Sequence, residues 1–179
     1  MQKTILRYGL LSGAVAALLM VVTALRIRAN PDFENGYFYG YAGILLSMVF
    51  VFLGVRSYRE QVNGGTISFG KGLQIGLLIA LISGVFYALT WMVASEIWLP
   101  DFMAKFVDHS LAKLQASGAD PAEIERQTAT MRQYQEMYKN PLLKFGLTFL
   151  EPFPVGLLVA LLSALILRKK TRKPPLDAK

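Results

Sequence analysis

The sequence predicts an all-α integral membrane protein, a four-helix bundle with an extracytoplasmic helical hairpin between its third and fourth spans. Three observations predict this class. Hydrophobic residues make up 54% of the 179 residues, which is more than a typical soluble domain contains. These residues are clustered in four blocks that are nearly free of charge. Basic residues are concentrated at alternate ends of the blocks, as in multi-pass membrane proteins.

A helix needs about 20 apolar residues to cross the hydrocarbon core of a membrane. The blocks that meet this requirement place four spans at about residues 8–25, 37–55, 73–95 and 145–167. The first block is longer than the core of a signal peptide, and no small-residue cleavage pattern follows it, so we expect a retained span. The fourth span reaches full length only if it extends back from Pro152 through Glu151 to about Phe145.

The charge distribution predicts orientation and location. With a cytoplasmic N-terminus, the cytoplasmic side has only two acidic residues, Glu60 and Asp177. Its basic residues are Lys3, Arg7, Arg56, Arg59, Lys71, Arg168, Lys169, Lys170, Arg172, Lys173 and Lys179. This positive-inside asymmetry predicts an inner (cytoplasmic) membrane protein with both termini, including a basic tail at residues 168–179, in the cytoplasm. Anionic membrane lipids then explain the net charge of +7, and no nucleic-acid partner is expected.

Residues 96–144 are the one segment with soluble character, and we expect them to form the hairpin. Its first arm carries an apolar stripe at helical spacing, formed by Phe102, Met103, Phe106, Val107, Leu111 and Leu114. We expect Gly118 to end this arm, and Asp120 with Pro121 to begin the second, because such residues suit the free backbone groups of helix ends. The stripe can pack on the second arm or in the headgroup layer, dock another protein, or cover a cavity between the spans.

The stretch GTISFGKG at residues 65–72 resembles a phosphate-binding loop, G-x-x-x-x-G-K-[ST]. Gly72 stands where the metal-binding hydroxyl is required, and the stretch joins two membrane helices instead of following a buried strand. We therefore expect no nucleotide. The pair Gly64 and Gly65 is expected to turn the chain, and Lys71 to anchor at the headgroups.

Small residues recur at every fourth position of the third span and form a ridge at Gly72, Gly76, Ala80, Gly84 and Ala88. Apolar side chains gain little by leaving lipid for one another, so membrane helices pack where small residues allow close approach. The ridge therefore predicts the central packing element, facing a helix of the same chain or of a second copy. The segments Leu10–Val22 and Leu81–Val93 also share a Ser-Gly pair, which a duplicated helical hairpin would explain.

No set of residues typical of catalysis occurs in the chain. It has no cysteine and one histidine, His109, which we expect at the hairpin surface, so we expect no metal, no cofactor and no enzymatic activity. Glu151 is the one acid placed at membrane depth, beside Pro152 and Pro154, which break a helix start. A carboxylate there is a candidate proton or cation site. In the alternative, the span starts near Pro152, and Glu151 lies among the headgroups, paired with Lys144.

The run GVRSYREQVNGGTISFGKG, together with PDF after the third span and NPLLKFGLTFLEPFPVG before the fourth, resembles a family of four-span bacterial membrane proteins, domain of unknown function 4199. The most specific part is R-x-x-R followed by G-G-x-I-S-F-G-K, at Arg56, Arg59, Gly64, Gly65, Ile67, Ser68, Phe69, Gly70 and Lys71. The resemblance covers nearly the whole chain. It implies a bacterial inner-membrane protein and brings no catalytic residues.

The sequence thus predicts a non-enzymatic membrane helix bundle that acts through a protein partner or as a homo-oligomer. We expect its contact surfaces to be the hairpin and the inner loop with Arg56, Arg59 and Lys71. The alternative is a small oligomeric proton- or cation-coupled transporter in which Glu151 titrates.

Overall fold

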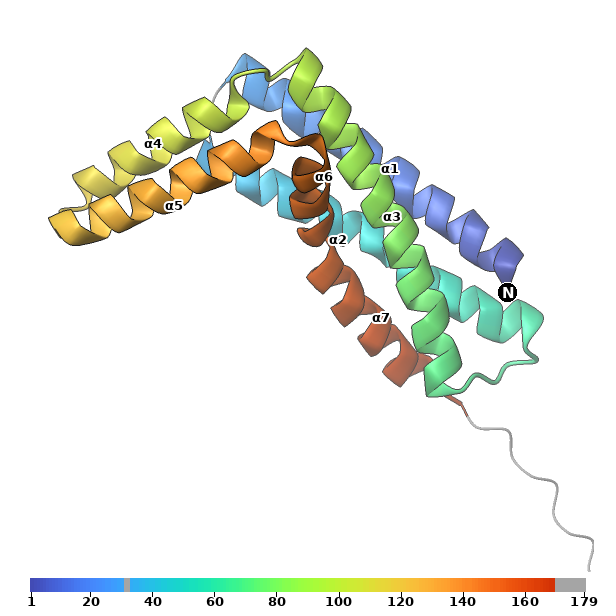
Figure 1. Cartoon of the computed structure of the whole chain (residues 1–179). Coiled ribbons are helices and arrows are strands. Elements are labelled where there is room, and N and C mark those ends of the chain that lie inside the picture. Colours follow the sequence, from blue (N-terminus) through green and yellow to red (C-terminus); the bar gives the residue numbers. More distant parts are fainter. Residues whose placement is uncertain (31–32, 170–179) are drawn as a thin grey trace, which may run out of the picture.

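The computed structural model describes residues 1–30 and 33–169, and over these residues the chain is all-α, as predicted (Figure 1). The helices are α1 (Gln2–Ala29), α2 (Phe33–Ser57), α3 (Phe69–Ile97), α4 (Phe102–Ala116), α5 (Pro121–Lys139), α6 (Pro141–Leu150) and α7 (Phe153–Leu167). A π-helical turn, η1 (Tyr58–Val62), continues α2. The described residues contain no strand, and one isolated bridge joins Ile67 to Lys169.

Four segments of the described chain are long and apolar enough to span a membrane, namely Gln2–Ala29, Phe38–Val62, Phe69–Ile97 and Pro141–Leu167. The fourth segment combines α6 and α7. The helices α1, α2, α3 and α7 pack together, whereas α4 and α5 form a hairpin that projects from one end of this bundle (Figure 1). We call this end the hairpin end. The opposite end, which holds the α2–α3 loop and the end of α7, is the basic end.

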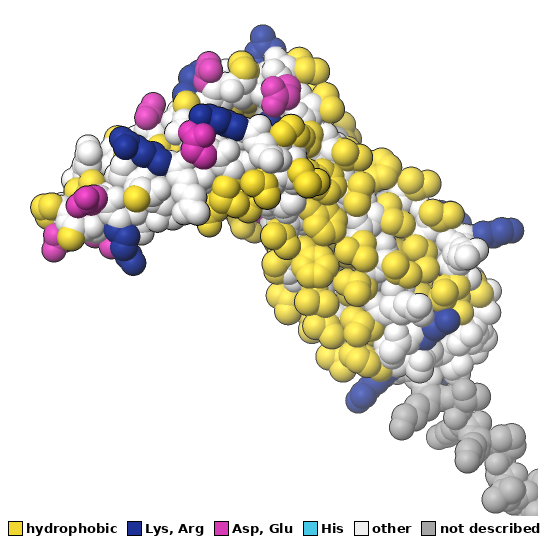
Figure 2. Space-filling model, viewed as in Figure 1, with side chains coloured by type: hydrophobic (Ala, Val, Ile, Leu, Met, Phe, Trp, Pro, Cys, Tyr) yellow, Lys and Arg dark blue, Asp and Glu magenta, His cyan; other side chains and the backbone are white. Residues whose placement is uncertain are grey.

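The sides of the bundle are apolar. Figure 2 shows hydrophobic side chains over the bundle, acidic side chains on the hairpin, and lysines and arginines on the hairpin and toward the basic end. Large apolar side chains point outward, such as Leu18 and Ile166, which are 63% and 67% exposed. Such a surface is unfavourable in water and is matched by hydrocarbon. The chain is therefore a multi-pass membrane protein.

The small residues of α3 lie against helices of the same chain. A Cβ added at Gly76 would be 3.0 Å from the Cβ of Ala160 in α7, and one added at Gly156 would be 2.9 Å from the Cβ of Ala80. Gly84 faces a phenyl ring of α6. A larger side chain at Gly76 or Gly156 would therefore contact an alanine of the facing helix.

Three buried serines link α1, α2 and α3 at the centre of the bundle. The Ser12 hydroxyl donates to the carbonyl oxygen of Ser47 at 2.7 Å, and the hydroxyl oxygens of Ser12 and Ser83 are 3.0 Å apart. Buried hydroxyls need such partners, because an unpaired polar group in apolar surroundings is unfavourable. Ser12 and Ser83 occupy equivalent positions in the two similar segments, and α1 and α3 run in the same direction (Figure 1). The duplication itself stays a prediction.

The loop between α2 and α3 closes the basic end. Gly64 and Gly65 have φ angles of +61° and +79°, which glycine adopts without steric cost, so the pair turns the chain as predicted. Ile67 follows the turn and is 2% exposed. Its backbone forms two hydrogen bonds with Lys169, of 3.1 and 2.9 Å. The loop is therefore packed against the end of α7 rather than extended into solvent.

Candidate functional site

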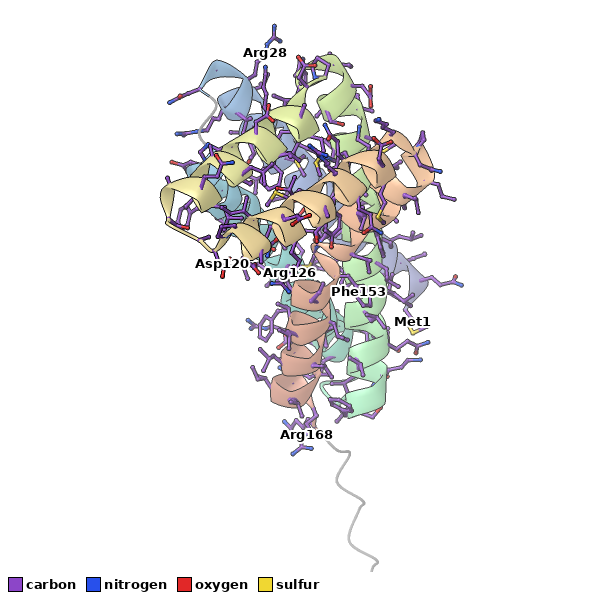
Figure 3. All side chains as sticks on the ribbon, turned by 60° about the vertical axis from the view of Figure 1, so that its left-hand side comes forward. Met1, Arg28, Asp120, Arg126, Phe153 and Arg168 are labelled. Atoms are coloured by element: carbon purple, nitrogen blue, oxygen red, sulfur yellow. The ribbon has the colours of Figure 1, made fainter. Side chains whose placement is uncertain are left out.

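A partly open cavity of about 580 Å³ lies where the hairpin meets the bundle. Figure 3 shows the hairpin, with Asp120 at its tip, crossing the hairpin end above Phe153 at the start of α7. The residues that line the cavity are Met20, Thr23, Ile27, Gly36, Gly40, Tyr41, Tyr87, Trp91, Phe102, Met103, Phe106, Val107, Met131, Tyr134, Tyr138, Leu147 and Glu151. The walls therefore come from α1, α2, α3, α6, the turn after α6 and both arms of the hairpin.

The apolar stripe of the first hairpin arm covers this cavity. Phe102, Met103, Phe106 and Val107 of α4 all line it. The helix α4 also packs on α5. Two of the roles that the sequence left open for the stripe are therefore observed, namely packing on the second arm and covering a cavity.

The first arm of the hairpin ends, and the second begins, at the residues that the sequence indicated, although the hairpin helices cover residues 102–139 and not the whole of 96–144. α4 ends just before Gly118, which has a φ of +71°, and Asp120 accepts a hydrogen bond from the amide of Ala122 at 3.0 Å in front of α5. Asn140 ends α5 and caps α6, because its side-chain oxygen accepts a hydrogen bond from the amide of Leu142 at 2.9 Å. Asp120 and Asn140 thus cap the starts of α5 and α6.

Trp91 of α3 contacts both arms of the hairpin. Its indole N–H donates to the Tyr138 hydroxyl of α5 at 2.7 Å. Its ring packs edge to face on Phe102 of α4, with 4.8 Å between the ring centres. Burial raises the pKa of the Tyr138 phenol, so the phenol stays neutral and keeps its hydroxyl hydrogen. Trp91 therefore anchors the hairpin to the bundle.

Lys144 pairs with Glu96 and not with Glu151. Its Nζ lies 2.7 Å from Oε1 of Glu96 and 5.5 Å from the centre of the Tyr138 ring. The Lys144 side chain is 8% exposed, whereas that of Glu96 is 72% exposed. The predicted pairing of Lys144 with Glu151 is therefore wrong. The end of α3 carries Glu96 to the first turns of α6, although the two partners are 48 residues apart in the chain.

Glu151 lies in the break between α6 and α7. The break follows from Pro152 and Pro154, which have no N–H to donate to a helical hydrogen bond. Oε2 of Glu151 accepts a hydrogen bond from the Tyr87 hydroxyl at 3.1 Å, and both residues line the cavity. Among the described residues, no lysine or arginine is within ion-pair distance of Glu151.

Glu151 and Tyr87 lie well inside their spanning segments. Glu151 is inside the candidate span Pro141–Leu167, and Tyr87 is inside Phe69–Ile97. At about 1.5 Å per helical residue, each lies about 15 Å from the hairpin-end terminus of its segment. By length and composition the fourth candidate segment begins at Pro141, and the depth of Glu151 in a membrane stays a prediction.

The three basic residues predicted as a cytoplasmic contact differ in exposure. Arg56 has a 54% exposed side chain and pairs with Glu60 at 3.1 Å. Arg59 is 22% exposed, and its Nη1 donates to the carbonyl oxygen of Leu167 at 3.3 Å, at the end of α7. Lys71 lies in the first turn of α3. Arg59 therefore helps to close the basic end, and a partner contact of the three residues stays a prediction.

Sequence reasoning missed Tyr87, Trp91 and Tyr138. A signal was available for the first two, because residues four apart share one face of a helix and α3 otherwise consists mainly of small and aliphatic residues at this point. Tyr138 gave no such signal, since it lies in a mostly polar segment. Within residues 1–30 and 33–169, no group of three histidine, aspartate or glutamate side chains could hold a metal ion.

The sequence model of the family described as "Protein of unknown function (DUF4199)" matches residues 7–169. The match includes the hairpin, the α2–α3 loop and nearly all of the four candidate spans. No curated protein and no solved structure matches the chain.

Proposed function

We propose a function from the premise that this chain belongs to the family of proteins of unknown function DUF4199. It is a non-enzymatic binding protein of a bacterial cytoplasmic membrane, and its cavity holds an apolar or amphiphilic small molecule. One observation carries the proposal, namely the partly open cavity of about 580 Å³ between bundle and hairpin. Small-molecule sites are typically concave, mostly apolar and about 300–1,000 Å³ in volume.

The walls of the cavity suit an amphiphilic ligand. Aromatic rings such as Trp91 and Phe102 supply a large apolar surface. The polar groups of the lining include the Tyr87 hydroxyl and the Glu151 carboxylate, which are hydrogen-bonded to each other. Such groups fix the orientation of a ligand whose binding energy comes mainly from apolar contact.

We propose that the basic end faces the cytoplasm and that the hairpin lies outside. The described residues of the basic end include one acid, Glu60, and the basic residues Lys3, Arg7, Arg56, Arg59, Lys71, Arg168 and Lys169, as the positive-inside rule requires. A reporter that is active only in the cytoplasm tests this orientation when fused after the C-terminal residue. Activity of a periplasm-specific reporter at that position would contradict it.

Gly40 allows a test of the cavity with a matched control. Gly40 lines the cavity, and a Cβ there would meet no atom within 4 Å, so Gly40→Leu fills space without a backbone clash. Gly146 leaves the same open space but does not line the cavity, so Gly146→Leu is the control. We expect native mass spectrometry of nanodisc-embedded protein to detect a small molecule on the wild type and on Gly146→Leu, and none on Gly40→Leu. Equal occupancy of all three proteins, or an empty wild type, would contradict the proposal.

Proton- or cation-coupled transport is a second candidate, favoured by the carboxylate of Glu151 inside a spanning segment. Because four spans enclose little volume, such a transporter would be an oligomer. Proton-dependent flux into liposomes that Glu151→Gln abolishes would support transport. A flux that is equal in both proteins would exclude Glu151 as its titrating group.

Action through a protein partner or through self-association is also proposed. The surfaces available for it are the hairpin exterior and the exposed side of the α2–α3 loop with Arg56. Crosslinking in native membranes tests this proposal, and a chain that crosslinks neither to a second copy nor to another protein would contradict it.

A further inference from the structure

We infer that the ligand of this cavity is an organic cation, a molecule with a positively charged nitrogen or comparable onium centre on an apolar or aromatic body. This inference rests on the proposed function, since it names the chemical class of the ligand. The charged centre binds against the carboxylate of Glu151, and the apolar body lies among the aromatic and methionine side chains of the hairpin and α3.

The charge of Glu151 is the first step of the argument. Glu151 is the one residue with a carboxylate or a basic group among the described residues that line the cavity. The Tyr87 hydroxyl is its hydrogen-bond donor, at 3.1 Å, and a single neutral donor leaves most of the carboxylate's charge unbalanced. A carboxyl group removed from water either takes up a proton or is paired with a cation, because its unpaired charge is unfavourable there. A cationic ligand supplies the missing charge.

The neighbouring lysine does not supply this charge. Lys144 is buried, and its ammonium is paired with Glu96 at 2.7 Å. Its side chain is not among those that line the cavity. With Glu151 ionised the cavity has a net negative charge, which favours a cation and disfavours a phosphate, a carboxylate or another anionic headgroup.

The walls favour an organic cation over a metal ion. Hard metal cations require several oxygen ligands, and no group of acidic or histidine side chains gathers here in the described chain. Aromatic rings attract organic cations through their negative faces, and Tyr87, Trp91 and Tyr138 supply such rings around one space. Met103 and Met131 add flexible, polarisable contacts that adapt to a bulky apolar body.

A pair of lipophilic ions tests the inference, because tetraphenylphosphonium and tetraphenylborate have nearly the same shape and opposite charge. The protein is placed in nanodiscs of zwitterionic lipid, and binding is measured by equilibrium dialysis against protein-free nanodiscs. The chain has two tryptophans, so Trp98→Phe leaves Trp91 as the only one, and its emission reports whether the ion occupies the cavity. We expect saturable binding of the cation with a change in Trp91 emission, and no saturable binding of the anion.

Charge variants complete the test. Glu151→Gln keeps the shape of the side chain and should weaken cation binding by about tenfold or more, as expected when one partner of a desolvated charge pair is removed. Glu151→Asp should restore most of the affinity. Glu136→Gln removes an exposed acid of α5 outside the cavity lining and should leave the affinity unchanged.

The outcomes separate the two proposals. Equal binding of cation and anion, or cation binding that Glu151→Gln leaves unchanged, would overturn the inference. If Gly40→Leu then still abolished that binding, the proposed cavity function would stand with a ligand of another class. If no probe bound saturably and the wild type carried no small molecule in native mass spectrometry, the organic-cation inference and the proposed binding function would both be wrong.

Discussion

Tyr138→Phe is expected to loosen the hairpin from the bundle. The Tyr138 hydroxyl accepts the indole N–H of Trp91 at 2.7 Å, and Trp91 is 6% exposed. The substitution leaves this N–H buried without its partner, which costs about 1–3 kcal/mol. Because about 1.4 kcal/mol is a factor of ten in an equilibrium constant, the opening equilibrium of the hairpin should rise by about 5- to 150-fold.

Hydrogen exchange measures this opening directly. The exchange rates of α5 amides in nanodisc-embedded protein should rise by the same factor when exchange is limited by local opening. Tyr134→Phe is the matched control, because Tyr134 also lies on α5 and lines the cavity but is 47% exposed. Its exchange rates should change by less than about twofold, as expected for a surface substitution.

A double-mutant cycle decides whether the Trp91–Tyr138 bond is responsible. Trp91→Phe and Tyr138→Phe should show a coupling free energy of about 0.5–1.5 kcal/mol. If the effects of the two substitutions were additive, or if Tyr138→Phe exchanged no faster than Tyr134→Phe, the anchoring role of Trp91 would be refuted.

Three further substitutions have defined outcomes. Gly76→Val should lower the free energy of unfolding by about 1–3 kcal/mol, because the added Cβ would lie 3.0 Å from the Cβ of Ala160 in α7. Gly146→Val is the control and should leave the free energy of unfolding nearly unchanged, because no atom lies within 4 Å of its Cβ. Ile67→Ala should cost about 2–5 kcal/mol in unfolding experiments, because Ile67 is a fully buried side chain, and a smaller loss would show that the loop does not contribute to the core. Glu96→Gln should destabilise the protein more than Lys144→Met, because only the first leaves a buried charge unpaired, and the reverse order in thermal melts would contradict this assignment.

The sequence predicted local structure well, because local signals depend on one segment at a time. The four apolar blocks became four candidate spans, although the helices extend beyond the expected bounds. The chain turns at Gly64 and Gly65, and the first hairpin arm ends just before Gly118, as predicted. Asp120 caps the second arm, as predicted. These features follow from backbone conformation and hydrogen-bond capacity, which a residue carries into any fold.

The candidate site was predicted only in part. Glu151 could be singled out, since a carboxylate in an apolar block is conspicuous by composition alone. Its hydrogen-bond donor Tyr87 and the true partner of Lys144 could not, because both contacts join α3 to the α6 region across more than 40 residues of chain. Nearness in sequence predicts a pair of Lys144 with Glu151, but in the structure Lys144 pairs with Glu96 of the neighbouring helix α3.

The amino-acid sequence by itself determined that the chain is helical, that four segments suit hydrocarbon and that basic residues lie at one end of the bundle. These features can be read from the sequence because hydropathy and charge are properties of single residues that add up along a segment. Only the tertiary structure decided which faces of the helices meet, that the hairpin covers a cavity, and that Trp91, Tyr87 and Glu151 share its walls. The physical reason is that these contacts depend on the rotation and offset of whole helices. Side-chain packing between helices sets that rotation and offset, and the apolar periodicity of a single helix does not specify it.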